Sequence, residues 1–221
     1  MQVVPAIIPK NREQMEEEIK KVSSFAHLVQ IDISDGIFTQ YKTWPYNGQD
    51  TEYFEKLKKE EIGLPRWEEV EYEVHLMIKN PEEVVLDWIH AGVSTIIAHI
   101  ESTENFQKVI DICRENEVLV GVAIKPSTDI EKIKTLVEKV DFIQVMGSDL
   151  LGKHGTKLED RAILMIKEIQ KLYPNKTIAV DIGVNQTTED ILKNAGATKL
   201  VSGGAILESA NPQEVYSDLS E

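Results

Sequence analysis

The stretch VQIDISDG, residues 29–36, decides which class of fold to expect. Its apolar residues Val29, Ile31 and Ile33 alternate with polar residues, among them Asp32, as in a β-strand with one apolar face. A strand on an open sheet would show its polar face to water, whereas a strand of a closed barrel points alternate residues into the lumen. The fold therefore depends on how the rest of the chain repeats this pattern.

Further strand-like runs accompany this one, and amphipathic helical patterns separate most of them. The strand-like runs are 3–8, 27–33, 71–77, 94–100, 117–124, 141–146, 177–182 and 198–203. The helical patterns cover 12–25, 81–92, 104–116, 129–140, 158–173 and 188–196. Eight strands alternating with helices in 221 residues predict an α/β protein with a single (β/α)8 TIM barrel. An open doubly wound sheet is the alternative, but it would not need eight such even units. No linker interrupts the pattern, so we expect residues 1–221 to form one domain.

Sorting each strand by parity separates an almost wholly apolar set of residues from a polar set. The polar set is Gln30, Asp32, His75, Met77, His99, Glu101, Lys125, Gln144, Met146 and Asp181. These residues lie near the C-terminal ends of their strands, where barrels of this kind keep their active sites. Because burying many ionisable groups without a ligand is costly, the pattern predicts an enclosed polar pocket. A buried ion pair, such as Lys125 with Glu101, or an aspartate that only caps a loop is the alternative.

Two carboxylates and an imidazole converge on this predicted pocket from three strands, namely Asp32, His75 and Asp181. Their oxygen and nitrogen donors suit Zn²⁺, Mn²⁺ or Fe²⁺. The two aspartates also form a two-base set, because they come from the second and seventh strands, on opposite sides of a small substrate. Glycines follow the seventh and eighth strands, where barrels often bind phosphate through backbone N–H groups. They are Gly183, Gly203 and Gly204.

Composition narrows the classes of partner and compartment. A formal net charge of −14 argues against nucleic acid or an anionic membrane as the main partner. The single cysteine, Cys113, excludes an internal disulfide, fits a reducing compartment and is expected to be a buried structural thiol. No apolar run approaches the length of a membrane span, and the N-terminus lacks the pattern of a signal peptide. We therefore expect a cytoplasmic protein.

At the residues of the predicted pocket the chain resembles the ribulose-phosphate 3-epimerase family. The resemblance rests on IDISDGIF, VHLMIKNPEE, HIEST, GVAIKP, VDIGVN and VSGGAIL, which follow in order over nearly the whole chain. It implies a (β/α)8 barrel and homo-oligomer that interconverts D-ribulose 5-phosphate and D-xylulose 5-phosphate with a divalent metal. It implies that Asp32 and Asp181 are an acid/base pair that also binds the metal, and that His75 is a metal histidine. The matched substrate positions are Met77 and Met146 beneath the sugar, and Gly183, Gly203 and Gly204 at the phosphate.

The chain also departs from the pattern of that family. Gln30 stands where the family usually has a second metal histidine, and Ala6 stands in place of an active-site serine. The loop after the sixth strand reads GSDLLGKHGTKL, residues 147–158, in place of a Gly-rich Asn-Pro-Gly-Phe-Gly-Gly run. Gly152 and Gly155 of this loop are the residues left to bind the substrate. TQYKTWPYNGQ replaces the usual Val-Pro-Asn after the second strand.

Three functions stay open at this point. The first is an epimerase that transfers a proton at C3 of a phosphorylated ketose, with Gln30 as the fourth metal ligand. The second is a non-catalytic or repurposed sugar-phosphate-binding barrel with a degraded metal site. The third is a decarboxylase or aldolase of related barrels, which carry Asp-x-Lys-x-x-Asp on an early strand; the run from Asp32 to Gly36 has no such lysine.

The remaining histidines and several residues near the predicted pocket have less specific expected roles. His99 and Glu101 are expected to orient the metal ligands. On the loop after the sixth strand, Lys153 and His154 either contact a phosphate or belong to a solvated loop. Trp44 and Tyr46 are expected to form a lid or a subunit contact, and His27 and His90 to be packing or surface residues.

Overall fold

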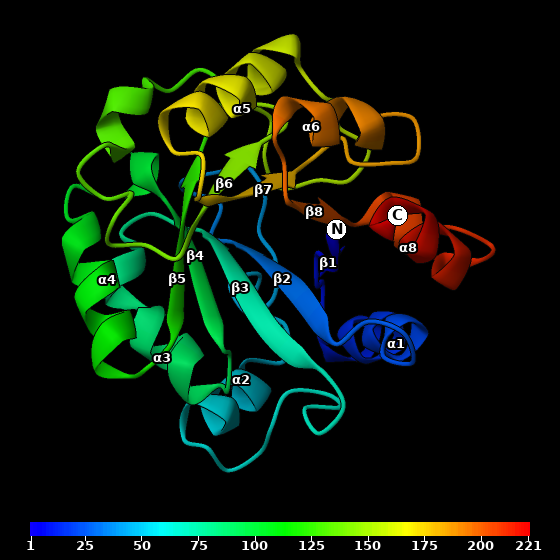
Figure 1. Ribbon diagram of the computed structural model, residues 1–221. Helices are drawn as coiled ribbons and strands as arrows, with labels where there is room; N and C mark the ends of the chain where they lie inside the picture. The colour runs from blue at the N-terminus through cyan, green and yellow to red at the C-terminus, as the bar shows by residue number, and fades with distance from the viewer.

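The computed structural model describes residues 1–221 and contains a closed barrel of parallel strands (Figure 1). Each strand pairs with its neighbour in chain order, and β8 closes the barrel on β1, with Val3 opposite Leu200. The protein is therefore a (β/α)8 TIM barrel, as the sequence predicts. The strands are β1 (Gln2–Ile7), β2 (Leu28–Ser34), β3 (Glu71–Met77), β4 (Thr95–His99), β5 (Leu119–Ile124), β6 (Phe142–Met146), β7 (Thr177–Asp181) and β8 (Lys199–Ser202).

Helices surround the barrel on its outer face (Figure 1). The α-helices are α1 (Arg12–Val22), α2 (Thr51–Lys58), α3 (Val85–His90), α4 (Phe106–Glu115), α5 (Asp160–Leu172), α6 (Glu189–Ala195), α7 (Gly204–Leu207) and α8 (Pro212–Ser220). Three short 3-10 helices lie between them: η1 (Pro81–Glu83), η2 (Ile100–Ser102) and η3 (Ile130–Ile133). The chain ends meet, because the amino group of Met1 donates a hydrogen bond of 2.9 Å to the Ser220 carbonyl. No helix has both the length and the apolar character that crossing a membrane would require.

Helix α1 illustrates how the sequence pattern produces these elements. The side chain of Asn11 accepts a hydrogen bond from the Gln14 backbone and so caps the first turn. Met15, Ile19 and Val22 recur at helical spacing and are all buried against the barrel. The first helix therefore lies where the periodicity predicts it.

The predicted helix over residues 129–140 is wrong. Only η3 forms there, and turns follow it up to residue 140. The carbonyls of Ile133 and Leu136 each accept a bond from the residue three positions on at 2.8 Å and from the residue four positions on at 3.1 Å, so no regular α-helical ladder forms. The apolar residues of this segment recur mainly every third position, which suits a 3-10 turn as well as an α-helix. Three helices that the sequence did not predict, α2, α7 and α8, are short, with four to nine residues each.

Two separate apolar clusters confirm the parity of the strands. Val29, Ile31 and Ile33 belong to the large core between the sheet and the helices. A smaller cluster fills the lumen and consists of Met77, Ile97, Ala123, Phe142, Met146, Leu151 and Ala179. The two faces of each strand therefore pack in different compartments, and the lumen is the one that carries polar groups.

Trp44 belongs to the outer core and is neither a lid nor a subunit contact. Its side chain is fully buried, with its ring at 5.5 Å from Phe54 and 6.0 Å from Trp88, both edge-on. Cys113 is likewise buried, and burial raises the pKa of its thiol to about 12, as expected for a structural residue.

Candidate active site

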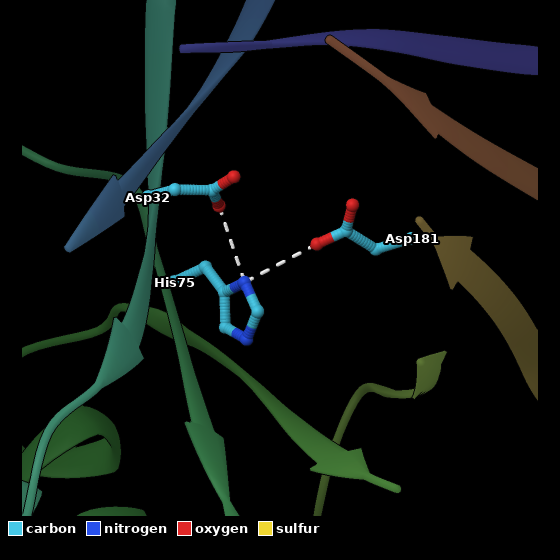
Figure 2. A group of neighbouring side chains, drawn as sticks. All are labelled: Asp32, His75 and Asp181. Atoms are coloured by element: carbon cyan, nitrogen blue, oxygen red, sulfur yellow. Dashed lines mark hydrogen bonds and ion pairs between the residues drawn. The ribbon is translucent and has the colours of Figure 1, made fainter. Parts of the chain in front are cut away.

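Asp32 on β2, His75 on β3 and Asp181 at the end of β7 meet at the C-terminal end of the lumen (Figure 2). The register between β2 and β3 places Asp32 directly opposite His75. The Nδ1 atom of His75 lies 3.2 Å from Oδ1 of Asp32 and 3.3 Å from Oδ2 of Asp181. One donor atom from each residue lies within 4.8 Å of the other two. The structure thus brings together the three residues that the sequence singled out.

Burial and mutual charge set the ionisation of this cluster. Burial raises the pKa of Asp32, the nearby Asp181 carboxylate raises it further, and the hydrogen bond with His75 opposes both. Burial alone would lower the pKa of His75, but hydrogen bonds to Asp181 and Asp32 outweigh it and raise this pKa to about 9. The site therefore favours positive charge between its two carboxylates.

Gln30 takes part in the same cluster from the floor of the lumen. Its Nε2 donates to Oδ1 of Asp32 at 2.7 Å and to Oδ2 of Asp181 at 3.2 Å. Its Oε1 is buried without any hydrogen-bond partner, which is rare for a buried polar atom. A carbonyl oxygen is a common ligand of hard cations, and turning the amide exchanges the positions of the nitrogen and the oxygen. Two carboxylates, one imidazole nitrogen and this oxygen therefore fit a divalent metal ion.

A chain of hydrogen bonds leads from His75 away from the carboxylates. Nε2 of His75 lies 2.9 Å from Nε2 of His99, and Nδ1 of His99 lies 3.0 Å from Glu101. Burial lowers the pKa of His99 to about 4. Burial would raise the pKa of Glu101, but its hydrogen bond to His99 and those it accepts nearby lower it to about 2. A charged Glu101 therefore orients His99, which in turn meets the side of His75 that faces away from the aspartates.

Lys125 does not form the ion pair with Glu101 that the sequence allowed. Its backbone N–H donates to Glu101 at 2.8 Å, whereas its ammonium group lies 4.4 Å from the centre of the Phe38 ring. The lumen groups at this end are thus held by hydrogen bonds and by a cation–π contact.

A cavity of about 650 Å³ opens above Asp32 and Asp181. Its size lies in the range of about 300–1,000 Å³ that is typical of small-molecule sites. Its lining includes Ala6 and all the residues that the sequence assigned to the substrate: Met77, Met146, Gly152, Gly155, Gly183, Gly203 and Gly204. Gln30 and His75 do not line it. The predicted site therefore divides into a buried cluster and a cavity that meets it at the two aspartates.

Strained backbone follows Asp181 directly. Ile182 has a φ of 81°, an uncommon conformation for a β-branched residue, and Gly183 has a φ of 75°. A Cβ on Gly147 would lie 1.9 Å from the carbonyl oxygen of Ile182, so only glycine fits there. The loops after β6 and β7 therefore pack closely against each other directly after Asp181.

The structure also adds residues to the cavity that the sequence reading missed or placed in a solvated loop. They are Lys153, His154, Thr156, Lys157, Asn185, Thr187, Thr188, Ser202 and Glu208. Most lie on βα-loops, which have no hydrophobic periodicity to reveal which way their side chains point. His27 and His90 are exposed, as expected.

A second buried ionisable pair lies at the other end of the lumen and was also missed. The ammonium group of Lys199 on β8 bonds to Glu73 on β3, and both residues are buried. Burial raises the pKa of Glu73, and the charge of Lys199 opposes this shift. The signal was present in the sequence, because Glu73 has the same strand parity as His75.

Comparisons with known proteins agree with this geometry. Residues 2–207 match the model of the Ribulose-phosphate 3 epimerase family. The ribulose-phosphate 3-epimerase of Schizosaccharomyces pombe is 35% identical over 152 residues, covering 69% of this chain and 66% of that protein. The enzyme of the same name from Bacillus subtilis is 26% identical over 225 residues, covering 99% and 98% of the two chains. The alignment thus spans about two thirds of the yeast relative and nearly all of the bacterial one.

Solved structures give the same fold. A 3-hexulose-6-phosphate synthase from Salmonella typhimurium superposes with a TM-score of 0.71 at 18% identity, over 100% of this chain and 97% of that one. Likeness at that level of identity shows the barrel alone. The family model, by contrast, matches from β1 through α7 and includes the strands that carry Asp32, His75 and Asp181. The chain belongs to the ribulose-phosphate 3-epimerase family.

Proposed function

We propose that this protein is an epimerase that inverts C3 of a phosphorylated ketose, with D-ribulose 5-phosphate and D-xylulose 5-phosphate as the substrate pair. The observation that carries the proposal is the placement of Asp32 and Asp181. They reach the same nitrogen of His75 from β2 and β7, which are not neighbours in the barrel, and both border the cavity. Inversion at carbon needs one group that removes a proton from one face and another that returns a proton to the opposite face.

In this proposal each aspartate acts on one face of C3. One carboxylate removes the C3 proton next to the C2 carbonyl, and the other, in its protonated form, donates to the opposite face. The pKa of Asp32 is raised by burial and by the neighbouring charge of Asp181, which favours a carboxyl group that can hold a proton. The two aspartates exchange roles when the reaction runs in the other direction.

The metal ligands in this proposal are Asp32, His75 through Nδ1, and Asp181, with Gln30 as a fourth ligand through Oε1. A divalent ion held there, Zn²⁺, Mn²⁺ or Fe²⁺, would supply stabilisation of negative charge on the substrate oxygens. His99 and Glu101 fix the orientation of the His75 ring through the bonds at 2.9 and 3.0 Å. Met77 and Met146 pack beneath the sugar, and the cavity-lining glycines 152, 155, 183, 203 and 204 let the backbone approach the substrate.

A second candidate is a sugar-phosphate-binding barrel without catalysis. Two observations favour it: the amide of Gln30 donates to both carboxylates in place of a histidine, and Ala6 offers no hydroxyl group to the cavity. Such a protein would keep the cavity and lose the metal. We rank it second because both aspartates that the epimerase would need are present and border the cavity.

The wider setting is also part of the proposal. We expect the chain to work as a single barrel domain in a cytoplasmic homo-oligomer, in pentose phosphate metabolism, without nucleic acid or membrane partners. The single buried cysteine supports the reducing compartment, and the net charge of −14 supports the absence of nucleic acid and anionic membrane partners.

The experiment that tests the proposal is proton exchange at C3. Protein purified without chelator is analysed for metal and then incubated in D₂O with D-ribulose 5-phosphate, with and without added Zn²⁺, Mn²⁺ or Fe²⁺. We expect bound metal, deuterium at C3 and formation of D-xylulose 5-phosphate. Absence of exchange with every metal, on pentulose and hexulose phosphates alike, would refute the epimerase, and phosphate binding without metal would favour the second candidate.

A further inference from the structure

The loop of residues 147–158 packs closely on the glycines that follow β7 and β8. A Cβ on Gly183 would lie 2.5 Å from the backbone nitrogen of Leu158, and a Cβ on Gly203 would lie 3.0 Å from Nε2 of His154. Side chains at these two positions would therefore push the loop away. Because these positions are glycines, the loop can pack against the outer end of the cavity. The imidazole of His154 occupies the space beside Gly203.

The imidazole of His154 carries an unused hydrogen-bonding atom. Its Nε2 is buried and has no partner, although the side chain as a whole is 26% exposed. Its other nitrogen, Nδ1, lies 3.8 Å from Oε1 of Glu208, which is beyond hydrogen-bond length. Buried polar atoms in proteins are nearly always paired, so Nε2, on a residue that lines the cavity, is left for a partner that the protein does not supply.

The charges that line the cavity are divided between its two ends. Three basic side chains, Lys153, His154 and Lys157, come from one stretch of the loop, in a chain with a net charge of −14. Asp32 and Asp181 lie at the inner end, and Glu208 is the one other carboxylate in the lining. Its side chain is 75% exposed, so water screens its charge. The outer end therefore suits an anion, and the inner end suits a cation.

We propose that His154 is a side-chain ligand of the substrate phosphate, with Nε2 donating to a phosphate oxygen beside Gly203. Lys153 and Lys157 add positive charge around the same group. In this chain the recognition of phosphate thus depends on a side chain of the loop after β6 as well as on backbone at the glycines. The inference rests on the proposed function for the identity of the sugar, but the binding of the anion itself can be measured separately.

The test measures the binding of inorganic phosphate to the full chain by titration calorimetry. His154→Ala removes the donor, and we expect the dissociation constant of phosphate to rise about tenfold or more, as for loss of a hydrogen bond to a charged group. His154→Gln keeps an N–H donor and should recover part of the affinity. His27→Gln, at an exposed histidine beside the N-terminal end of β2, is the matched control and should bind phosphate as the parent does.

Kinetics with D-ribulose 5-phosphate provide the second readout. His154→Ala should raise KM by a similar factor and leave kcat within about twofold, because the residue touches the phosphate and not the reacting carbon. If His154→Ala binds phosphate equally well or more tightly, the imidazole only covers the site and the proposal is overturned. Should the alanine variant fail to fold, His154→Gln is compared with His154→Leu, which has no donor. The proposal stands if the glutamine variant binds phosphate more tightly, and it is overturned if the two bind equally.

These outcomes separate this inference from the proposed epimerase. If His154→Ala loses phosphate affinity while the parent exchanges no C3 proton, the phosphate ligand stands and the epimerase fails. If the parent is an active epimerase and His154→Ala changes neither KM nor phosphate affinity, the epimerase stands and the phosphate ligand fails.

Discussion

The two ends of the barrel lumen both bury ionisable side chains, and they balance charge in opposite ways. At the N-terminal end, Glu73 bonds to Lys199, whose ammonium group also lies 4.5 Å from the centre of the Phe142 ring. At the C-terminal end, Asp32 and Asp181 share the Nδ1 atom of one histidine and have no lysine or arginine partner. Only this second group borders the cavity.

The difference shows how buried charge can be interpreted in a barrel. The charge of Glu73 is balanced by its own ammonium partner, closed off from solvent, although Oε1 of Glu73 has no hydrogen-bond partner. Two carboxylates on one imidazole leave negative charge to be satisfied by a cation or a proton. Burial alone therefore does not mark a functional site, whereas burial combined with excess charge and an adjoining cavity does.

Breaking the pair at the N-terminal end should have the largest effect on stability. Lys199→Met leaves Glu73 buried without a partner, and we expect the free energy of unfolding to fall by about 3–5 kcal/mol in urea titrations. Replacing both residues, as Glu73→Leu with Lys199→Met, should restore most of the loss because no charge remains buried. Both substitutions change only the stability of the fold, because Glu73 and Lys199 do not line the cavity. The turnover of the folded protein should therefore be unchanged. A single variant as stable as the parent would show that the pair is not the closed, structural unit described above.

Removing a carboxylate at the C-terminal end of the lumen should lower turnover and leave the stability of the fold intact. Asp32→Asn or Asp181→Asn removes one of the two proposed proton-transfer groups, so turnover should fall by at least about a hundredfold. The metal-free fold should be unharmed or slightly stabilised, because like-charge repulsion between the two carboxylates is relieved. Turnover and the melting temperature without metal are measured on the same preparations. Near-normal turnover in both variants, or melting far below the parent, would make these aspartates structural and remove the contrast between the two ends.

Parity of the strands accounts for how much of this picture the sequence predicts. A strand alternates strictly between its two faces, so polar positions such as His75 and Asp181 identify the lumen before any coordinates are known. Glu73 has the same parity and was missed because its partner, Lys199, is 126 positions away in the chain. The loop after β6 has no periodicity, so the direction of His154 could not be predicted. The turns over residues 129–140 were missed because apolar spacing alone does not distinguish a 3-10 turn from an α-helix.

Glu101 is a further, largely buried carboxylate in the lumen, and its charge is stabilised mainly by hydrogen bonds. Burial would raise its pKa, but bonds from His99, the Lys125 backbone and Thr128 lower this pKa from 4.5 to about 2. Because the unfolded chain then binds the proton more readily, the stabilisation is complete above pH 4.5 and is lost as the pH falls toward 2. The loss in unfolding free energy caused by Glu101→Gln should therefore be constant above that window and should shrink within it. A difference between parent and variant that does not change with pH would show that the charge of Glu101 is not what stabilises the fold.

The smallest expected effect comes from changing the neutral member of the C-terminal cluster. Gln30 donates to both aspartates and leaves its oxygen without a partner, so it contributes a weak ligand at best. Gln30→His places an imidazole nitrogen at the same point. We expect metal affinity to rise about tenfold, which is the low end of the effect that residues hydrogen-bonded to metal ligands have on metal affinity. Turnover should be equal or higher. Gln30→Met removes the oxygen at similar length and should weaken metal binding. Competition titrations with a chromophoric chelator measure both affinities. If the two variants hold the metal equally well, position 30 does not contact the ion, and the excess charge at this end is satisfied by Asp32, His75 and Asp181 alone.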